Sequence, residues 1–131
     1  MQVVKTDNTV FFDVDDTLVM WDIPEDREHE VIVFESFSYP TRLLPHLKHI
    51  ELMKQFKARG HLVVVWSQGG YEWAEAVVNR LDIAKYVDIV MSKPKWIVDD
   101  LPASAWTSRS YLDLNGKRLT SAFVPGHEEK K

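Results

Sequence analysis

The chain has 131 residues, with 16 Lys and Arg against 20 Asp and Glu for a formal net charge of -4, and it contains no cysteine. This length suits one compact core, and the lack of cysteine excludes disulfide frameworks and Cys-built zinc or iron–sulfur sites. Because the acidic balance is spread along the chain without a basic block, the composition disfavours a dedicated duplex-DNA binder. No apolar run approaches the roughly 20 residues of a membrane span and no signal-peptide core is evident, so we expect a soluble cytoplasmic protein with no membrane partner.

The first part of the chain is predicted to hold a strand, a flap and a helix. Residues 9–12 are β-branched or aromatic and stop at Asp13, which predicts a buried strand ending in acid. Residues 19–42 are predicted to form a short flap hairpin, because aromatic side chains alternate with serines after a polar stretch. From Pro45 to Gly60 apolar residues recur at helical spacing, with the proline in the first turn and the glycine as the stop.

The middle of the chain alternates predicted strands with a helix. The apolar runs at 61–66 and 87–91 are too continuous for half-exposed strands and predict buried ones. A helix is expected over 73–81 between them, and residues 96–98 are predicted to form a very short fourth strand. This alternation predicts an α/β fold with a three-layer Rossmann-like core, in which helices cover the faces of a parallel sheet.

The rest of the chain is predicted to extend this core without adding a second domain. Asn115 and Gly116 lie between alternating flanks, which predicts a small C-terminal hairpin. No repeat or low-complexity segment interrupts the sequence. We therefore expect one domain over 1–131, with a core at about 9–102 and a C-terminal extension over 103–131.

Polar residues follow each of the predicted strands. The carboxyl ends of parallel strands meet at one edge of a sheet, which is where ligands bind in such folds. Converging carboxylates repel one another, and a hard cation with oxygen ligands, above all Mg²⁺, relieves that repulsion and recruits phosphate. Lys93 and the hydroxyls of Thr17 and Ser67 would then hold the remaining phosphoryl oxygens. The residues delivered by the strand ends are Asp13, Asp15, Asp16, Ser67, Lys93, Asp99 and Asp100.

The spacing of Asp13 and Asp15 predicts that the two acids have different tasks. Residues at i and i+2 just past a strand can share a face and act on one reacting centre. A carboxylate is a good nucleophile toward phosphorus when a metal neutralises the incoming phosphate, and it gives an aspartyl-phosphate that water later cleaves. That route needs an acid for the leaving oxygen and then a base for water, and Asp15 is placed for both.

These residues resemble the motifs of the haloacid dehalogenase superfamily. Ser67 is similar to the second motif of that family, a Ser or Thr that closes an apolar strand, while Lys93-Pro94 resembles the third and residues 97–100 the acidic fourth. The motifs follow the family's order over about residues 9–102, and the ordered set is more specific than any one motif. The first motif, apolar residues before Asp-x-Asp-x-Thr-Leu, resembles Phe11-Phe12-Asp13-Val14-Asp15-Asp16-Thr17-Leu18.

The resemblance implies a Mg²⁺-dependent phosphatase acting on phosphate monoesters. It implies Asp13 as the nucleophile and a metal ligand, and Asp15 as the acid and base whose backbone carbonyl also binds the metal. Lys93 would neutralise charge on Asp13 and on the phosphate. By the same resemblance, Thr17 and Ser67 would bind phosphoryl oxygens, and the remaining metal ligand would be Asp99 or Asp100. Gln68 and Gly69, which follow Ser67, are predicted as further substrate-binding residues.

Two features depart from the usual pattern of that family. Only Pro94 and Lys95 separate Lys93 from the predicted fourth strand, so the core is shortened and Lys95 is a second candidate for the catalytic lysine. Lys93 is preferred because a Lys-Pro pair is common there in the family. The insert at 19–42 is too small for a helical cap domain, so we expect an open site for a phosphorylated small molecule or a nucleic-acid end, or a site that needs an oligomer partner as its lid. The sequence leaves the oligomeric state open.

Two other functions are compatible with part of this pattern. A signalling receiver domain also holds an aspartyl-phosphate with acids, a hydroxyl and a lysine at strand ends. It places its phospho-acceptor on the third strand, however, where this chain has Lys93. A catalytically idle binding module would keep the fold, although every expected polar position is filled here.

The remaining histidines and aromatic residues have plainer interpretations. His46 and His49 are three apart on a predicted helix, and a solvated helix face is favoured over a metal site because no third ligand is evident. A group of flap aromatics either stacks on a substrate or covers the core. These aromatics are Trp21, Phe34, Phe37 and Tyr39.

Overall fold

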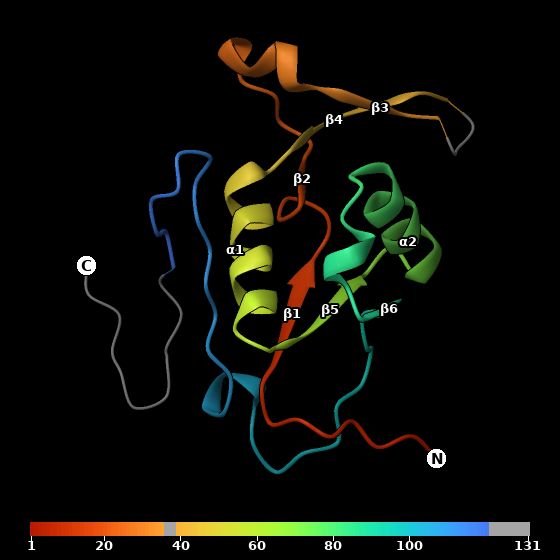
Figure 1. Cartoon of the computed structure of the whole chain (residues 1–131), viewed down its shortest axis with the longest axis vertical. Coiled ribbons are helices and arrows are strands. Elements are labelled where there is room, and N and C mark those ends of the chain that lie inside the picture. The colour runs from red at the N-terminus through yellow and green to blue at the C-terminus, as the bar shows by residue number, and fades with distance from the viewer. Residues whose placement is uncertain (36–38, 121–131) are drawn as a thin grey trace. The chain divides into compact units, whose positions relative to one another are not determined.

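The computed structural model describes residues 1–35 and 39–120 of the chain (Figure 1). The chain divides into two compact units, Met1–Lys93 and Pro94–Lys131, and each is described by itself. Phe37 of the predicted flap and residues 121–131 of the predicted C-terminal extension lie outside the described residues. The expectation of one domain over 1–131 stays a prediction, because compact units can share one folding transition.

The first unit is built on a parallel sheet. Its strands are β1 (Thr9–Asp13), β5 (Leu62–Ser67) and β6 (Ile89–Ser92), in the order β1-β5-β6. The strands are rich in valine, isoleucine and aromatic residues, whose branched or flat side chains pack well on a pleated surface. The α/β class and the parallel sheet predicted from the sequence are therefore confirmed.

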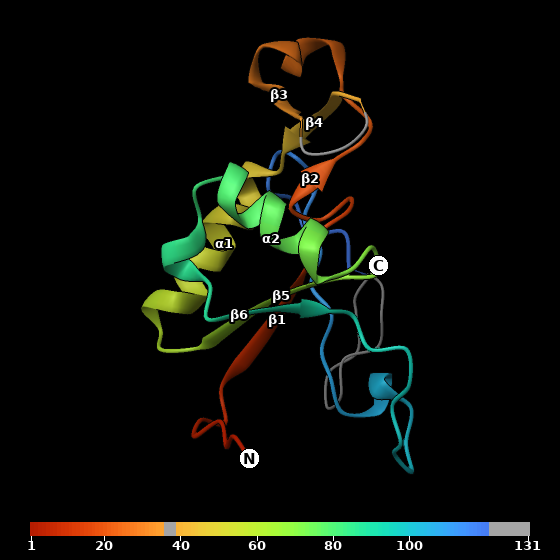
Figure 2. The same cartoon turned by 90° about the vertical axis from the view of Figure 1, so that its right-hand side faces the viewer.

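Two helices cover the same face of this sheet. These are α1 (Leu47–Ala58) and α2 (Tyr71–Arg80), which lie on one side of the strands in Figure 2. Val63 and Val65 of β5 belong to the same buried core cluster as side chains of both helices. The strand order β1-β5-β6 explains this placement, because crossovers between parallel strands are almost always right-handed and two that step in the same direction put both helices on one side. Within the described residues of this unit both helices therefore lie on one face, and the predicted three-layer Rossmann-like core stays a prediction. Gly60 ends α1 as predicted, with a φ of 86° that suits glycine.

The segment predicted as a flap forms a small antiparallel sheet of its own. Its strands are β2 (Val19–Met20), β3 (Ile32–Phe34) and β4 (Thr41–Pro45), in the order β2-β4-β3, with a 3-10 helix, η1 (Glu25–Glu30), between the first two. The placement of Pro45 in the first helical turn was wrong. Pro45 closes β4, and His46 caps α1 by accepting a hydrogen bond from the backbone of His49.

The second unit contains turns, a 3-10 helix, η3 (Ala103–Ala105), and a small hairpin. The predicted fourth strand is not formed, and Trp96 and Val98 are 88% and 102% exposed. Pro94 has no N–H to donate to a ladder, and three residues are too few to form a stable strand without a paired edge. The C-terminal hairpin is present as a bridge between Leu112 and Arg118, with Gly116 at a φ of 90° in the turn.

Asp88 joins three elements of the first unit just before β6. Its carboxylate accepts hydrogen bonds from Lys57 Nζ of α1 at 2.7 and 2.9 Å and from the backbone N–H of Val63 in β5 at 2.8 Å. The bond from Lys57 is the largest cause that lowers the pKa of Asp88. A lowered carboxyl pKa adds stability above its ordinary range and loses it as pH falls through the folded value.

We expect Asp88→Asn to lower the free energy of unfolding by about 1 kcal/mol near neutral pH, because the partly exposed ion pair and its charge-assisted bonds are lost. The difference should shrink in acid, as pH falls through the lowered pKa of the native Asp88 carboxyl and that group is itself protonated. Urea unfolding of the variant and the unmodified protein, near neutral pH and in acid, measures the difference in the free energy of unfolding. The exposed Asp22→Asn is the control, and an undiminished difference in acid would contradict the assignment.

Candidate functional site

The candidate site lies at the carboxyl-terminal edge of the parallel sheet. Asp13 ends β1, Ser67 ends β5, and Lys93 follows β6 directly, with its N–H donating to the Ser67 carbonyl at 2.8 Å. The parallel register pairs Asp13 with Trp66, so the first two strands end level with one another. Lys93 Nζ lies 3.7 Å from Asp13 Oδ1. The edge therefore pairs a partly exposed carboxylate with a lysine from a strand end far away in sequence.

A tight turn after β1 brings Thr17 back to Asp13. The Val14 carbonyl accepts hydrogen bonds from the N–H groups of Thr17, Leu18 and Val19 at 2.9–3.2 Å. The turn requires a φ of 59° at Asp16, in the left-handed region that Asp tolerates better than most residues. As a result Thr17 Oγ1 donates to Asp13 Oδ2 at 3.2 Å. The two oxygens of Asp13 thus face a hydroxyl and an ammonium group.

Asp15 has a different environment, built from indole N–H groups. Trp21 Nε1 donates to Asp15 Oδ1 at 3.0 Å, and Trp73 Nε1 lies 3.1 and 3.2 Å from the two carboxylate oxygens. Ser67 Oγ makes a longer contact of 3.5 Å to Oδ2. Asp16 turns to the base of the flap, where its Oδ1 accepts from the Trp21 backbone N–H at 3.2 Å.

The loop after β5 is shaped by its glycines. The buried Ser67 hydroxyl accepts from the Gly69 N–H at 2.9 Å. A Cβ on Gly69 would lie 3.2 Å from Trp73 Cδ1 and 3.3 Å from Ser67 Oγ, so a larger residue would push these neighbours back by a few tenths of an ångström. Gly70, with a φ of 103°, starts α2. Gln68 is exposed beside them, so the three predicted substrate-binding residues of this loop lie at one rim.

The prediction that His46 and His49 lie on a solvated helix face was wrong. His46 and His49 are buried, at 0% and 2% exposure, and their rings stack with centroids 3.7 Å apart. His49 Nδ1 lies 2.7 Å from the Thr17 carbonyl, to which it donates, and the His46 N–H donates to the Leu18 carbonyl at 2.9 Å. The pair therefore fastens the start of α1 to the turn that carries Thr17.

The remaining predicted site residues belong to the second unit. Asp99 accepts a hydrogen bond from the Leu101 N–H at 3.0 Å, which is the first cause of its lowered pKa. Asp100 and Lys95 are exposed. Because the two units are described separately, metal binding by Asp99 or Asp100 and a catalytic role for Lys95 stay predictions.

The donor atoms of the first unit are of the kind that Mg²⁺ prefers. Among the described residues, no three Asp, Glu, His or Cys side chains form a group that could hold a metal ion. Mg²⁺ in proteins is commonly bound by one or two carboxylates together with waters and substrate phosphates. The Asp13 carboxylate and the Asp15 backbone carbonyl would be hard oxygen donors of this type.

The aromatic residues of the flap have separate roles. Phe34 is 1% exposed and packs against Trp73, with ring centroids 5.5 Å apart, so it covers the core. Trp21 and Tyr39 are 51% and 70% exposed. The hydrogen bond from Trp73 to Asp15 was not predicted, because the spacing of Trp73 with Val77 and Leu81 marks only an apolar helix face. The glycines just before it are the one local sign of close packing.

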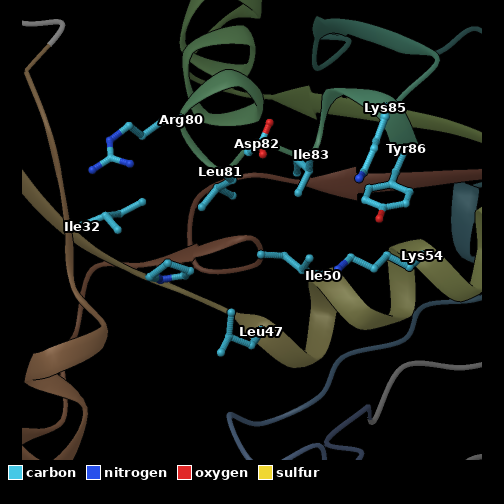
Figure 3. Close-up of a pocket in the computed structure, with 11 residues that line it drawn as sticks. Ile32, Leu47, Ile50, Lys54, Arg80, Leu81, Asp82, Ile83, Lys85 and Tyr86 are labelled. Carbon is cyan, nitrogen blue, oxygen red and sulfur yellow. The ribbon is translucent and has the colours of Figure 1, made fainter.

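A cavity of about 400 Å³ lies apart from these residues (Figure 3). Its walls come from the flap, α1 and the segment after α2, and include Ile50, Lys54, Arg80 and Tyr86. The Nζ atoms of Lys54 and Lys85 each lie 5.3 Å from the centre of the Tyr86 ring. None of the predicted site residues lines this cavity, so the cavity and the candidate site are separate features.

Comparisons with family models, with curated proteins and with solved structures found no match to this chain. The likeness of its motifs to the haloacid dehalogenase superfamily therefore stays a prediction. In the described ranges, 1–35 and 39–120, no helix has the length and apolar character needed to cross a membrane.

The buried histidine pair predicts a pH-dependent stability. Burial lowers the pKa of His49 from 6.5 to about 4, so the unfolded chain takes up a proton at higher pH than the native one. The fold should lose up to about 3 kcal/mol as pH falls from about 6.5 to about 4. In His49→Gln, urea unfolding should show a flatter pH dependence over this range.

The exposed His29→Gln is the matched control, and it should keep the slope of the unmodified protein. An unchanged slope in His49→Gln would show that His49 is not the group responsible.

Proposed function

We propose that this protein is a phosphomonoester hydrolase of the haloacid dehalogenase type, which acts through an aspartyl-phosphate on Asp13 and uses Mg²⁺. The observation that carries the proposal is the placement of Lys93 and Thr17 on the two oxygens of Asp13, at 3.7 and 3.2 Å. A nucleophilic carboxylate needs nearby positive charge and donors that also hold the incoming phosphoryl oxygens. Strand ends and turns that are separate in sequence supply both groups.

In the first half of the reaction, an Asp13 oxygen forms a bond to phosphorus while the bond from phosphorus to the leaving oxygen breaks. Asp15 supplies the proton that the leaving oxygen takes up. Lys93 and the hydroxyls of Thr17 and Ser67 hold the equatorial phosphoryl oxygens, where negative charge accumulates.

In the second half, water cleaves the phosphorus–oxygen bond of the aspartyl-phosphate. Asp15, now a carboxylate, takes the proton from that water and is restored to its acid form, while Asp13 is released as a carboxylate. Inorganic phosphate and the dephosphorylated alcohol are the products, so no further reactant is consumed.

Bound Mg²⁺ would offset the repulsion between the phosphate and the carboxylates. Within the first unit, the Asp13 carboxylate and the Asp15 backbone carbonyl would hold it, with waters and a phosphoryl oxygen as further ligands. The resemblance adds Asp99 or Asp100 as a predicted ligand.

We propose a phosphate on a larger molecule as the substrate, such as a nucleotide or a nucleic-acid end. Asp13 is partly exposed, and the described residues of the flap, 19–35 and 39–42, form a small antiparallel sheet with one short 3-10 helix and no helical domain that would enclose the ligand. The exposed Trp21 beside Asp15 offers an aromatic face at the rim.

Asp13→Asn should abolish Mg²⁺-dependent release of phosphate from p-nitrophenyl phosphate, because the amide is not a nucleophile toward phosphorus. Released phosphate is measured with the full chain, with and without Mg²⁺. A chain that keeps a long-lived phosphoryl group without turnover would be a receiver-like domain. No phosphorylation and no release from any phosphate monoester would indicate an idle binding module.

Lys93→Met should lower kcat by at least about a hundredfold, the usual loss when one stabilising donor is removed from a transition state. The matched control is Lys95→Met, at the neighbouring lysine of the same segment, which should keep most of the activity. A larger loss in Lys95→Met than in Lys93→Met would reverse the assignment of the catalytic lysine.

A further inference from the structure

Two tryptophans from separate elements converge on the carboxylate of Asp15. Trp73 belongs to α2, and its Nε1 lies 3.1 and 3.2 Å from the two oxygens. Trp21 follows β2 at the base of the flap, and its Nε1 lies 3.0 Å from Oδ1. An indole N–H can only donate, so both rings fix this carboxylate as an acceptor.

The two rings differ in how firmly they are held. Trp73 is half-buried, packs against the buried Phe34 and touches the Gly69 loop, where an added Cβ would lie 3.2 Å away. Trp21 is 51% exposed. Trp73 is therefore a fixed donor, whereas the Trp21 side chain can leave Asp15 without opening the core.

The hydrogen-bond demands on Asp15 change during the proposed reaction. As the acid, Asp15 must present a protonated oxygen to the leaving group, and as the base it must face a water molecule. Both oxygens accept from Trp73, and Oδ1 accepts from Trp21 as well. One of these two indole N–H groups must move away from Oδ1 before Oδ1 can face the leaving oxygen. Trp21 is able to move because its ring is exposed.

We infer that Trp73 is the positioning residue for Asp15, and that Trp21 is a donor on the flap which the leaving group displaces. The inference rests on the proposed function and deepens it. Trp73 keeps the carboxylate in one orientation through both halves of the reaction. Trp21 holds Oδ1 until a substrate enters, and so couples the flap to the acid and base.

The first experiment compares leaving groups in Trp73→Phe, which keeps an aromatic ring against Phe34 but removes the N–H donor. The readout is the rate at which Asp13 is phosphorylated in a single turnover, because hydrolysis of the aspartyl-phosphate is common to both substrates. An alkyl phosphate needs the acid and should lose about tenfold in this rate, a part of the usual contribution of a general acid. p-Nitrophenyl phosphate, whose leaving group departs without a proton, should lose much less. Equal losses for both substrates would overturn the positioning role.

Phe34→Leu is the matched control, because it weakens the packing around Trp73 and leaves the donor in place. It should lower stability and affect both substrates by the same factor. A leaving-group dependence like that of Trp73→Phe would mean that packing, and not the N–H bond, is responsible.

The second experiment follows the indole N–H signals of the five tryptophans by NMR, with Trp→Phe variants as assignments. Asp15→Asn should shift the signals of Trp21 and Trp73. In Asp13→Asn with Mg²⁺ and saturating phenyl phosphate, the Trp21 signal should move while that of Trp73 stays. A fixed Trp21 signal with bound phenyl phosphate would overturn the displacement.

Failure of the proposed function and failure of this inference give different experimental results. If the unmodified protein releases no phosphate from any monoester, the proposed function falls and the catalytic role of both rings falls with it. If it is active but Trp73→Phe loses equally on both substrates, only the inference falls.

Discussion

The site depends on the alignment of strand ends in a parallel sheet. Because β1, β5 and β6 run in the same direction and end together, a carboxylate, a hydroxyl and an ammonium group reach one edge. The contact between Lys93 and Asp13 depends on that alignment, because the two residues lie eighty positions apart and are brought together by strand pairing. A one-residue slip of β6 would turn Lys93 to the other face.

Asp13 and Asp15 have contrasting environments, which fit the different roles proposed for them. Asp13 is partnered by a cation and a hydroxyl, and Asp15 by neutral indole donors and a serine. A cation places positive charge beside the proposed nucleophile, whereas neutral donors orient a carboxylate without adding charge. Pairs of titratable groups with contrasting surroundings are a common basis for nucleophile and acid–base assignments.

The sequence was informative where one local pattern decides the structure. Apolar runs followed by polar residues located the three paired strands and the residues at their ends, because burial of such runs allows few alternatives. Prediction from the sequence failed where a residue far away in the chain determines the environment of a side chain. His46 and His49 are buried through stacking and a bond to Thr17, and the indoles of Trp21 and Trp73 meet at Asp15 only after folding. The residues at 96–98 have strand composition but no paired neighbour.

The most direct test of this account is the covalent state of Asp13 during turnover. Asp15→Asn should form the aspartyl-phosphate with a good leaving group and hydrolyse it slowly, because the base for water is lost. Acid-quenched protein incubated with Mg²⁺ and p-nitrophenyl phosphate is digested and read by mass spectrometry. The account predicts a phosphoryl group on Asp13; a phosphoryl group on another residue, or turnover in which no residue is ever phosphorylated, would contradict it.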